Sequence, residues 1–136
     1  MTAWFADASA LLAGSDPDDR EHKAARSLLE GGAAILTLDL AYYEVMNVAL
    51  RSWRNPAAAR RLRGFVTAIA EDGGLIRIDD TLAAAAAELA ERHGLSAHDA
   101  TYVAAAAATG ARLVSCDVRD LVGPGLALTP SQAVAA

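Results

Sequence analysis

The stretch Ala3-Trp4-Phe5-Ala6-Asp7-Ala8-Ser9-Ala10-Leu11-Leu12 decides the fold class of this chain. Its apolar start, residues 3–6, ends at Asp7, and Leu11 and Leu12 then begin the spacing of a helix. The stretch therefore predicts a short buried strand that turns directly into a helix. Strands that are apolar throughout are typical of parallel sheets covered by helices on both faces.

Strand-like and helix-like segments alternate along the rest of the chain. Further strands are predicted at residues 34–37, 75–78 and 113–116, with a weaker fifth strand at 126–128. Further helices are predicted at residues 17–31, 40–54, 56–72, 82–93 and 96–109, because capping residues precede them and glycine follows most of them. This order predicts an α/β fold with three layers, α/β/α, around a central, mostly parallel sheet of four to five strands.

The length and composition predict one domain over residues 1–136. The chain has 136 residues, 54% of them hydrophobic, and domains usually have roughly 100–200 residues. Its longest uncharged stretch, residues 121–136, is broken by Pro124 and Pro130, so no membrane-spanning segment is expected. Residues 1–6 carry no Lys or Arg, and Asp7 interrupts the apolar run, which predicts a cytoplasmic protein without a secretory leader. The single cysteine, Cys116, excludes an internal disulfide and a multi-cysteine zinc site.

The common ligand motifs of α/β proteins are missing from the sequence. Asp7-Ala8-Ser9-Ala10-Leu11 follows the first predicted strand, where a dinucleotide-binding protein would carry Gly-x-Gly-x-x-Gly. The sequence has no Gly-x-x-x-x-Gly-Lys phosphate loop and no Gly-x-Ser-x-Gly nucleophile elbow. Its one lysine, Lys23, falls inside a predicted helix. Carboxylates are what remains at the ends of the strands.

Carboxylates at this position favour a metal site. The carboxyl ends of parallel strands form the binding crevice of open α/β sheets, and several carboxylates there repel one another unless a cation or protons neutralise them. An all-acid site without His or Cys favours Mg²⁺ or Mn²⁺ over zinc and suits phosphodiester hydrolysis. The acids in question are Asp7, Asp39, Glu44, Asp79, Asp80, Asp99, Asp117 and Asp120.

Four segments together resemble a PIN domain, and most closely the VapC-type toxins of bacterial toxin–antitoxin pairs. They are Asp7-Ala8-Ser9, residues 43–49, residues 96–102 and residues 113–117, and they span essentially the whole chain. The resemblance implies a Mg²⁺- or Mn²⁺-dependent endoribonuclease that hydrolyses RNA with a metal-activated water. It implies that the catalytic and metal-binding acids are Asp7, Glu44, Asp99 and Asp117, with support from Ser115.

The resemblance also implies partners: an RNA substrate, a cognate VapB-like antitoxin that blocks the site, and a second copy of the chain in a homodimer. His98 departs from the family pattern, which often has Tyr at this place. Two further residues are expected to support the acids, since Ser9 follows Asp7 and Asn47 lies one helical turn after Glu44.

A purely structural role stays open for each acid. Asp7 and Asp117 can cap the helices that follow them, and Asp99 stands three residues after Ser96, in the position of a capping-box acid. Glu44 has apolar neighbours at helical spacing, which predicts a buried face where an unpaired carboxylate is costly, although a helix edge is the alternative. Asp120 can share an ion with Asp117 or pair with Arg119. Capping alone explains Asp79 and Asp80. His98 can be a base or only a neighbour of Asp99.

The charge is distributed unevenly. The net charge is −5, which argues against general affinity for nucleic acid. However, residues 45–70 contain no acid and five of the twelve basic residues. This segment can bind RNA phosphates and stack a base, it can be a solvated helical hairpin, or it can serve a protein partner. The predicted RNA-binding residues are Arg51, Trp53, Arg54, Arg60 and Arg61, with Arg63 beside them.

Three functions from different classes remain from the sequence alone. The first is the toxin endoribonuclease, and the second is a PIN nuclease that processes RNA or cleaves DNA. The third is a non-catalytic binding module whose acids only cap helices. The same acids serve the first two functions, so residue types do not separate them.

Overall fold

A parallel four-stranded sheet forms the centre of the computed structural model, which describes residues 2–136. The strand order is β3-β2-β1-β4, and all three pairings are parallel. In the register of the central strand, Trp4 lies opposite Ile35 on one side and Arg112 on the other. The strands are β1 (Trp4–Ala6), β2 (Ile35–Leu38), β3 (Leu75–Ile76) and β4 (Arg112–Val114).

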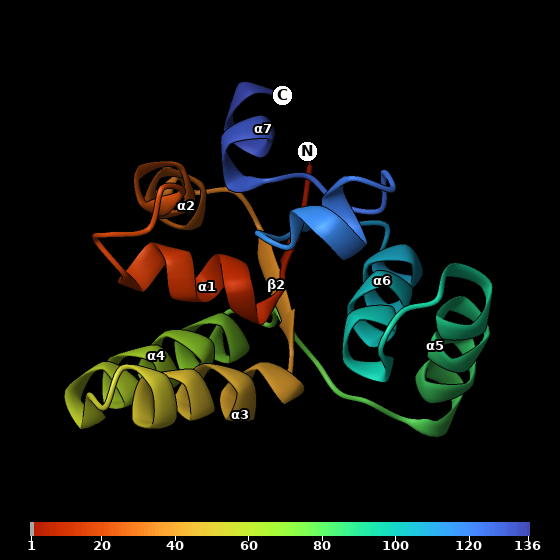
Figure 1. Cartoon of the computed structure of the whole chain (residues 1–136), viewed down its shortest axis with the longest axis horizontal. Helices are drawn as coiled ribbons and strands as arrows, with labels where there is room; N and C mark the ends of the chain where they lie inside the picture. The colour runs from red at the N-terminus through yellow and green to blue at the C-terminus, as the bar shows by residue number, and fades with distance from the viewer. Residues whose placement is uncertain (1) are drawn as a thin grey trace.

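Helices cover both faces of this sheet, as predicted. Figure 1 shows the sheet nearly edge-on, with α1 to α4 on one side and α5 and α6 on the other. The helices are α1 (Ala8–Ser15), α2 (His22–Glu30), α3 (Leu40–Asn47), α4 (Pro56–Glu71), α5 (Asp80–His93), α6 (Ala97–Thr109) and α7 (Pro130–Ala135), with π-helical turns η1 (Val48–Ser52) and η2 (Val118–Val122).

Strand β1 divides the core into two layers because successive strand side chains point to opposite faces. Trp4 and Ala6 pack with α1 to α4, whereas Phe5 packs with α5 and α6. Phe5 is fully buried, and burial of such a side chain stabilises the fold by roughly 1.5–3 kcal/mol. The apolar run that ends at Asp7 therefore fixes the sheet between its two helical layers.

The prediction for the start of the second helix was wrong. The helix α2 begins at His22, not at Pro17, and residues 17–21 form turns and a bend. Asp16 Oδ1 accepts from the amide of Asp18, and Asp19 Oδ1 accepts from the amide of Glu21. These local hydrogen bonds compete with helix initiation, so Asp16 and Asp19 stabilise a loop instead of a first helical turn.

The chain after Val122 also differs from the prediction. The proposed strand at residues 126–128 is reduced to a single bridge between Leu128 and Val114. The unpredicted helix α7 follows, and its start is a capping box between Thr129 and Gln132. The sequence Thr129-Pro130-Ser131-Gln132 carries this capping signature.

Two smaller predictions also need correction. The strand predicted at residues 75–78 is only the two-residue β3. Asp39 makes no capping hydrogen bond to α3; its Oδ2 accepts from the amide of Ile78 at 3.4 Å instead.

Within residues 2–136, no helix has both the length and the hydropathy to cross a membrane.

The close contact of Gly74 with β2 predicts that Gly74→Ala destabilises the protein. A Cβ at this position would lie 2.2 Å from the carbonyl oxygen of Ile35, so β3 would have to move away from β2. We expect a loss of roughly 1–3 kcal/mol in the free energy of unfolding, measured by urea denaturation.

Gly64→Ala is the matched control for this prediction. Gly64 lies within α4, and a Cβ there would have no neighbour within 4 Å. Alanine should stabilise this helix by about 0.5–1 kcal/mol. Equal effects of the two substitutions would contradict the proposed packing of β3.

Candidate metal centre

The predicted acids lie at the carboxyl ends of the strands or in the first turns of the flanking helices. Asp7 follows β1, and Asp117 lies just beyond β4, the neighbour of β1. Glu44 lies in the second turn of α3 on one face of the sheet, and Asp99 lies in the first turn of α6 on the other. The parallel topology thus directs segments that are far apart in sequence toward one edge of the sheet.

The capping role expected for two acids is present in the structure. Asp7 Oδ1 accepts from the amide of Ala10 at 3.0 Å, and Asp117 Oδ1 accepts from the amide of Asp120 at 3.0 Å. Both caps use one oxygen of the carboxylate, so capping leaves the second oxygen of each acid for another partner. Structural and functional roles are therefore compatible at both positions.

Asp99 does not complete the expected capping box. Ser96 Oγ accepts from the amide of Asp99 at 3.1 Å, which caps α6. Within residues 2–136, the Asp99 carboxylate returns no hydrogen bond to Ser96, in contrast to Gln132 and Thr129 in α7. Helix initiation therefore does not occupy the Asp99 carboxylate.

Three carboxylates come within the reach of one ion. Asp99, Asp117 and Asp120 each offer an oxygen atom, and these atoms lie within 4.8 Å of one another. All three residues are half-buried. Asp120 also pairs with the exposed Arg119, whose Nε lies 3.1 Å from Asp120 Oδ1. The pair with Arg119 is therefore present, and the proximity to Asp117, which the spacing of one helical turn indicated, leaves the proposed sharing of an ion compatible with it.

Asp7 and Glu44 lie outside this ion-sized group of three but belong to the same electrostatic environment. Burial raises the pKa of Asp7 to about 6 against the lowering effects of Ser115, Ser9 and the amide of Ala10, and the charge of Glu44 raises it further. Burial also raises the pKa of Glu44, with Tyr102 and His98 opposing it and Asp99 adding to it.

Asp99 completes this chain of interactions. Burial is the main cause that raises the pKa of Asp99, and the charges of Asp117 and Asp120 raise it further. The hydroxyl of Ser96 and the charge of His98 oppose the shift. The acids therefore repel one another in a partly desolvated site, and a bound cation would relieve this repulsion.

Two serines connect the loops that carry Asp7 and Asp117. Ser9 Oγ donates to Asp7 Oδ1 at 2.6 Å and accepts from the amide of Cys116 at 2.8 Å. Ser115 Oγ lies 3.3 Å from Ser9 Oγ and accepts from the amide of Asp117 at 3.0 Å. Ser115 is fully buried. These contacts fix the loop after β1 relative to the loop after β4.

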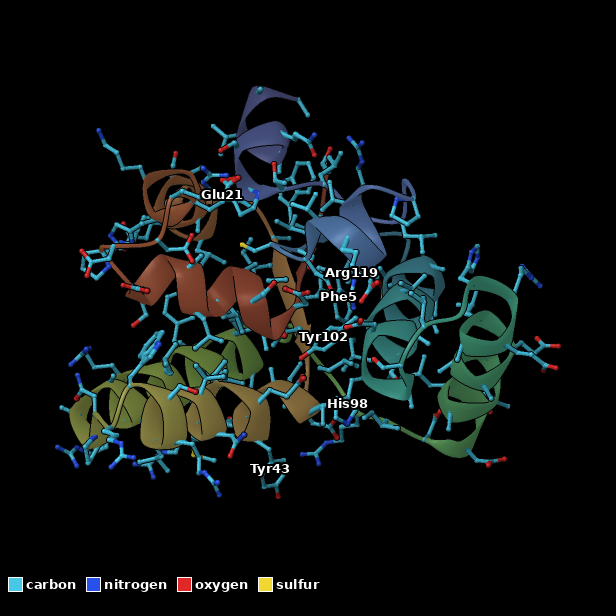
Figure 2. All side chains as sticks on the ribbon, viewed as in Figure 1. Phe5, Glu21, Tyr43, His98, Tyr102 and Arg119 are labelled. Atoms are coloured by element: carbon cyan, nitrogen blue, oxygen red, sulfur yellow. The ribbon has the colours of Figure 1, made fainter. Side chains whose placement is uncertain are left out.

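Glu44 is held by a residue that sequence analysis did not single out. The hydroxyl of Tyr102 donates to Glu44 Oε1 at 2.8 Å, and His98 Nδ1 lies 3.9 Å from Glu44 Oε2. Figure 2 shows Tyr102 and His98 in the space between α3 and α6. Asn47 is exposed, and within residues 2–136 it makes no hydrogen bond to Glu44. The sequence analysis included Tyr102 only within residues 96–102 and gave it no role, because its partner Glu44 is far away in the sequence.

The predicted RNA-binding residues lie at a different end of the same helical layer. Helix α3 starts near the centre of the molecule, and η1 and the start of α4 lie at the far end of the α3–α4 pair (Figure 1). The arginines there are exposed, whereas Trp53 is half-buried and packs against the core. The residues concerned are Arg51, Trp53, Arg54, Arg60 and Arg61, with Arg63 one turn further.

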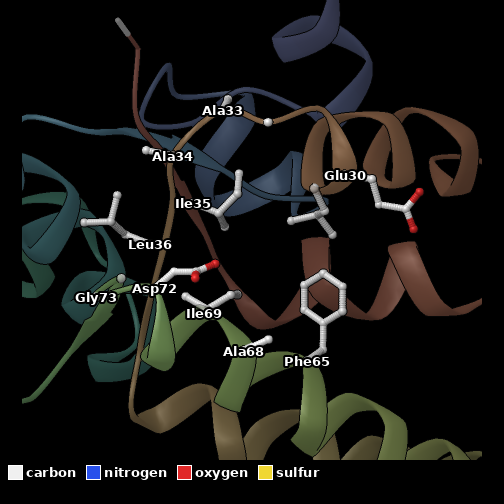
Figure 3. Close-up of a pocket in the computed structure, with 13 residues that line it drawn as sticks. Glu30, Ala33, Ala34, Ile35, Leu36, Phe65, Ala68, Ile69, Asp72 and Gly73 are labelled. Carbon is white, nitrogen blue, oxygen red and sulfur yellow. The ribbon is translucent and has the colours of Figure 1, made fainter.

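A hollow of about 590 Å³ between α2, α4 and the edge of β2 is separate from the candidate metal centre. Figure 3 shows that Ile35, Phe65 and Ile69 line it, together with Glu30 and Asp72. None of the four predicted site acids lines this hollow.

The fold and the site define a three-layer α/β protein with an acidic centre at the carboxyl edge of a parallel sheet. The model of the PIN domain family matches residues 5–121. The chain therefore belongs to the PIN domain family. A search of curated proteins finds no sequence match.

Solved structures with the same fold include toxins of toxin–antitoxin pairs. A toxin–antitoxin complex from Klebsiella pneumoniae matches with a TM-score of 0.68 and 21% identity, over 95% of this chain and 98% of that chain. The protein PAE2754 from Pyrobaculum aerophilum matches with a TM-score of 0.73 and 22% identity, over 98% of this chain and 95% of that chain. VapC20 from Mycobacterium tuberculosis, described as a sarcin–ricin loop cleaving toxin, matches with a TM-score of 0.69 and 20% identity, over 90% of this chain and 95% of that chain.

The raised pKa of Asp7 predicts that the metal-free protein loses stability as the pH rises. Asp7 has an ordinary pKa of 3.8 and a folded-state pKa of about 6, so the folded state binds the proton more tightly than the unfolded state. The proton on Asp7 therefore stabilises the folded state by roughly 3 kcal/mol. This stabilisation is complete below about pH 4 and is lost as the pH rises through 6.

Asp7→Asn removes this titration and keeps an oxygen that can cap α1. In chelator, we expect the variant to melt at a higher temperature than the native chain at pH 7, and the difference should shrink toward pH 4. The measurement is a thermal melt by circular dichroism at each pH. A variant that is less stable at pH 7 would indicate that Asp7 serves mainly as a helix cap.

Proposed function

We propose that this chain is a Mg²⁺- or Mn²⁺-dependent endoribonuclease and the toxin of a VapBC-type toxin–antitoxin pair, formed by one PIN domain over residues 1–136. The approach of carboxylate oxygens of Asp99, Asp117 and Asp120 to within 4.8 Å of one another carries the proposal. Glu44 interacts electrostatically with Asp99 of this group, and Asp7 interacts with Glu44. We take Asp7, Glu44, Asp99 and Asp117 as the catalytic acids and add Asp120 to the metal ligands.

The available donor atoms suit a hard cation. The acids offer only oxygen ligands, which Mg²⁺ and Mn²⁺ prefer. Cys116 lies beside the site, but burial and the charge of Asp7 raise the pKa of its thiol to about 12. A single thiol also falls short of the several Cys or His ligands that zinc sites use.

The residues of this chain orient the reacting groups. Ser9 and Ser115 keep the Asp7 and Asp117 loops together, and Glu44 and Asp99 approach from opposite faces of the sheet. A bound Mg²⁺ or Mn²⁺ would activate a water molecule and balance the negative charge that develops on the phosphate. Water then forms a bond to phosphorus while the bond from phosphorus to the 3′ oxygen breaks, which leaves a 5′-phosphate and a 3′-hydroxyl.

The structural neighbours support the proposed biological role. The neighbour from Mycobacterium tuberculosis is described as a toxin that cleaves the sarcin–ricin loop, and the neighbour from Klebsiella pneumoniae is a toxin–antitoxin complex. By analogy, we propose a VapB-like antitoxin as partner, a homodimer as the assembly and the cytoplasm as location. A basic side chain of the antitoxin that enters the acid cluster would compensate its charge as a metal ion does.

The proposed chemistry predicts metal-dependent cleavage of RNA with defined ends. Incubation with total cellular RNA and Mn²⁺ or Mg²⁺ should produce fragments that carry 5′-phosphates and 3′-hydroxyls, and a chelator should prevent it. Asp99→Asn and Asp117→Asn should each lower the rate at least about 100-fold, because they remove metal ligands. Sequencing of fragment ends measures the chemistry, and gel assays measure the rate.

Asp80→Asn serves as the matched control because Asp80 is an exposed acid in the first turn of α5. It should leave the rate unchanged. Fragments with 2′,3′-cyclic phosphates would reject the proposed chemistry. Cleavage of single-stranded DNA without cleavage of RNA would instead support a DNA nuclease.

The arginine-rich end of α3 and α4 predicts salt-dependent binding of RNA. We propose that Arg51, Trp53, Arg54, Arg60 and Arg61 contact RNA beyond the cleaved bond. At low substrate concentration the cleavage rate should fall as salt rises, and the double variant Arg51→Ala/Arg54→Ala should lower the log–log slope by roughly 0.7 for each phosphate contact removed.

Arg92→Ala is the control for charge alone, since Arg92 is exposed on α5 on the other face of the sheet. Its salt slope should equal that of the native chain. If the slope of the double variant also stays unchanged, these arginines do not bind RNA and a protein partner becomes the better explanation.

A further inference from the structure

Tyr102 is a buried polar residue that the proposed chemistry has not used. Its side chain is 2% exposed, yet its hydroxyl reaches across the site and donates to Glu44 Oε1 at 2.8 Å. The contact joins α6 to α3, two helices from opposite faces of the sheet (Figure 2). A hydroxyl buried at this depth needs an acceptor, and Glu44 supplies it.

The ring of Tyr102 is fixed independently of Glu44. It packs edge-on against Phe5, with ring centroids 6.3 Å apart and planes at 78°. Phe5 is itself fully buried in the central strand β1. The position of the hydroxyl is therefore set by the core of the sheet.

Glu44 needs such a support because its side chain is long and only half-buried. A glutamate at this depth loses conformational freedom when it binds a ligand, and this loss opposes binding. His98 approaches Glu44 Oε2 at 3.9 Å, but its side chain is 67% exposed and gives little fixed support. The hydrogen bond from Tyr102 uses one lone pair of Oε1, whereas Oε2 accepts no hydrogen bond within residues 2–136 and is the more accessible oxygen for a cation.

We propose that Tyr102 is a positioning residue that holds Oε1 of Glu44 and so presents the other carboxylate oxygen to the divalent ion. The inference rests on the proposed function, since it takes Glu44 as a metal ligand. Groups that orient metal-binding side chains typically contribute 10- to 100-fold to metal affinity. Tyr102 acts on the ion through Glu44 and touches neither the substrate nor the ion.

Tyr102→Phe tests the proposal because it removes only the hydroxyl. We expect Mn²⁺ to bind about 10-fold more weakly to this variant of the full chain, measured by titration calorimetry. Tyr42→Phe is the matched control: Tyr42 also has a hydroxyl hydrogen-bonded at 2.8 Å, but to Thr67 Oγ1 between α3 and α4. The control should bind Mn²⁺ as the native chain does, and thermal melts in chelator should show whether the two variants lose similar stability.

A double-mutant cycle separates positioning from general loosening of the fold. In the Glu44→Gln background, Tyr102→Phe should have no further effect on Mn²⁺ affinity, because the carboxylate that Tyr102 orients is gone. A full additional loss in that background would overturn the proposal. Native Mn²⁺ affinity in Tyr102→Phe, or no Mn²⁺ binding to the native chain at all, would overturn it too.

The RNA cleavage assay distinguishes failure of this inference from failure of the proposed function. A native chain that cleaves RNA, together with a Tyr102→Phe variant of unchanged Mn²⁺ affinity, retains the function and rejects the positioning role. A native chain that binds Mn²⁺ through Tyr102-supported Glu44 but cleaves no RNA retains the positioning role and rejects the function.

Discussion

Repulsion between carboxylates at one edge of the sheet is the constraint on which the rest of this structure depends. The neighbouring strands β1 and β4 place Asp7 and Asp117 in adjacent loops, and helices from both faces add Glu44 and Asp99. Each of Asp7, Glu44 and Asp99 has a pKa raised first by burial and then by another acid. A fold optimised for stability alone would separate these groups, so their proximity indicates a function that uses the concentrated charge.

The fold tolerates this repulsion because neutral donors surround the acids. Hydroxyls of Ser9 and Tyr102 and the amide of Ala10 donate to them, which stabilises the anions without providing a compensating positive charge. Asp7 and Asp117 use one carboxylate oxygen as a helix cap. The choice between a capping residue and a metal ligand is therefore not exclusive, since a carboxylate has two oxygens and each can serve a different purpose.

The sequence predicted the layers and most elements because strand and helix patterns are local. An apolar run before Asp7 and glycines after helices are visible without any knowledge of distant contacts. The start of α2 was misplaced because turn formation and helix capping use the same residues, as Asp16 illustrates. Helix α7 was missed although Thr129 and Gln132 form a capping box, because residues 126–128 were interpreted as a strand that ends at Pro130.

Within the site, sequence reasoning found the acids but not their detailed arrangement. The approach of Asp99 to Asp117 and Asp120 depends on how α6 packs over β4, which residue types do not encode locally. Tyr102 received no role from the sequence, and only its contact with Glu44, 58 positions away in sequence, reveals a polar role. Long-range contacts of this kind require the three-dimensional structure.

Opposite charges lie at Glu44 in α3 and at Arg51 in the following turn η1, and they bear on the proposed binding of RNA by a chain with a net charge of −5. Glu44 lies near the start of this helical segment and Arg51 seven residues later, which at 1.5 Å per residue is roughly 10 Å along the axis. Without a cation, the acidic end repels phosphate while the arginine-rich end attracts it. A divalent ion at the acids would reduce the negative charge at the first end only, and so would weaken the repulsion of phosphate there. The proposed binding of a metal ion and the proposed binding of RNA would therefore be thermodynamically coupled, since each would make the other more favourable.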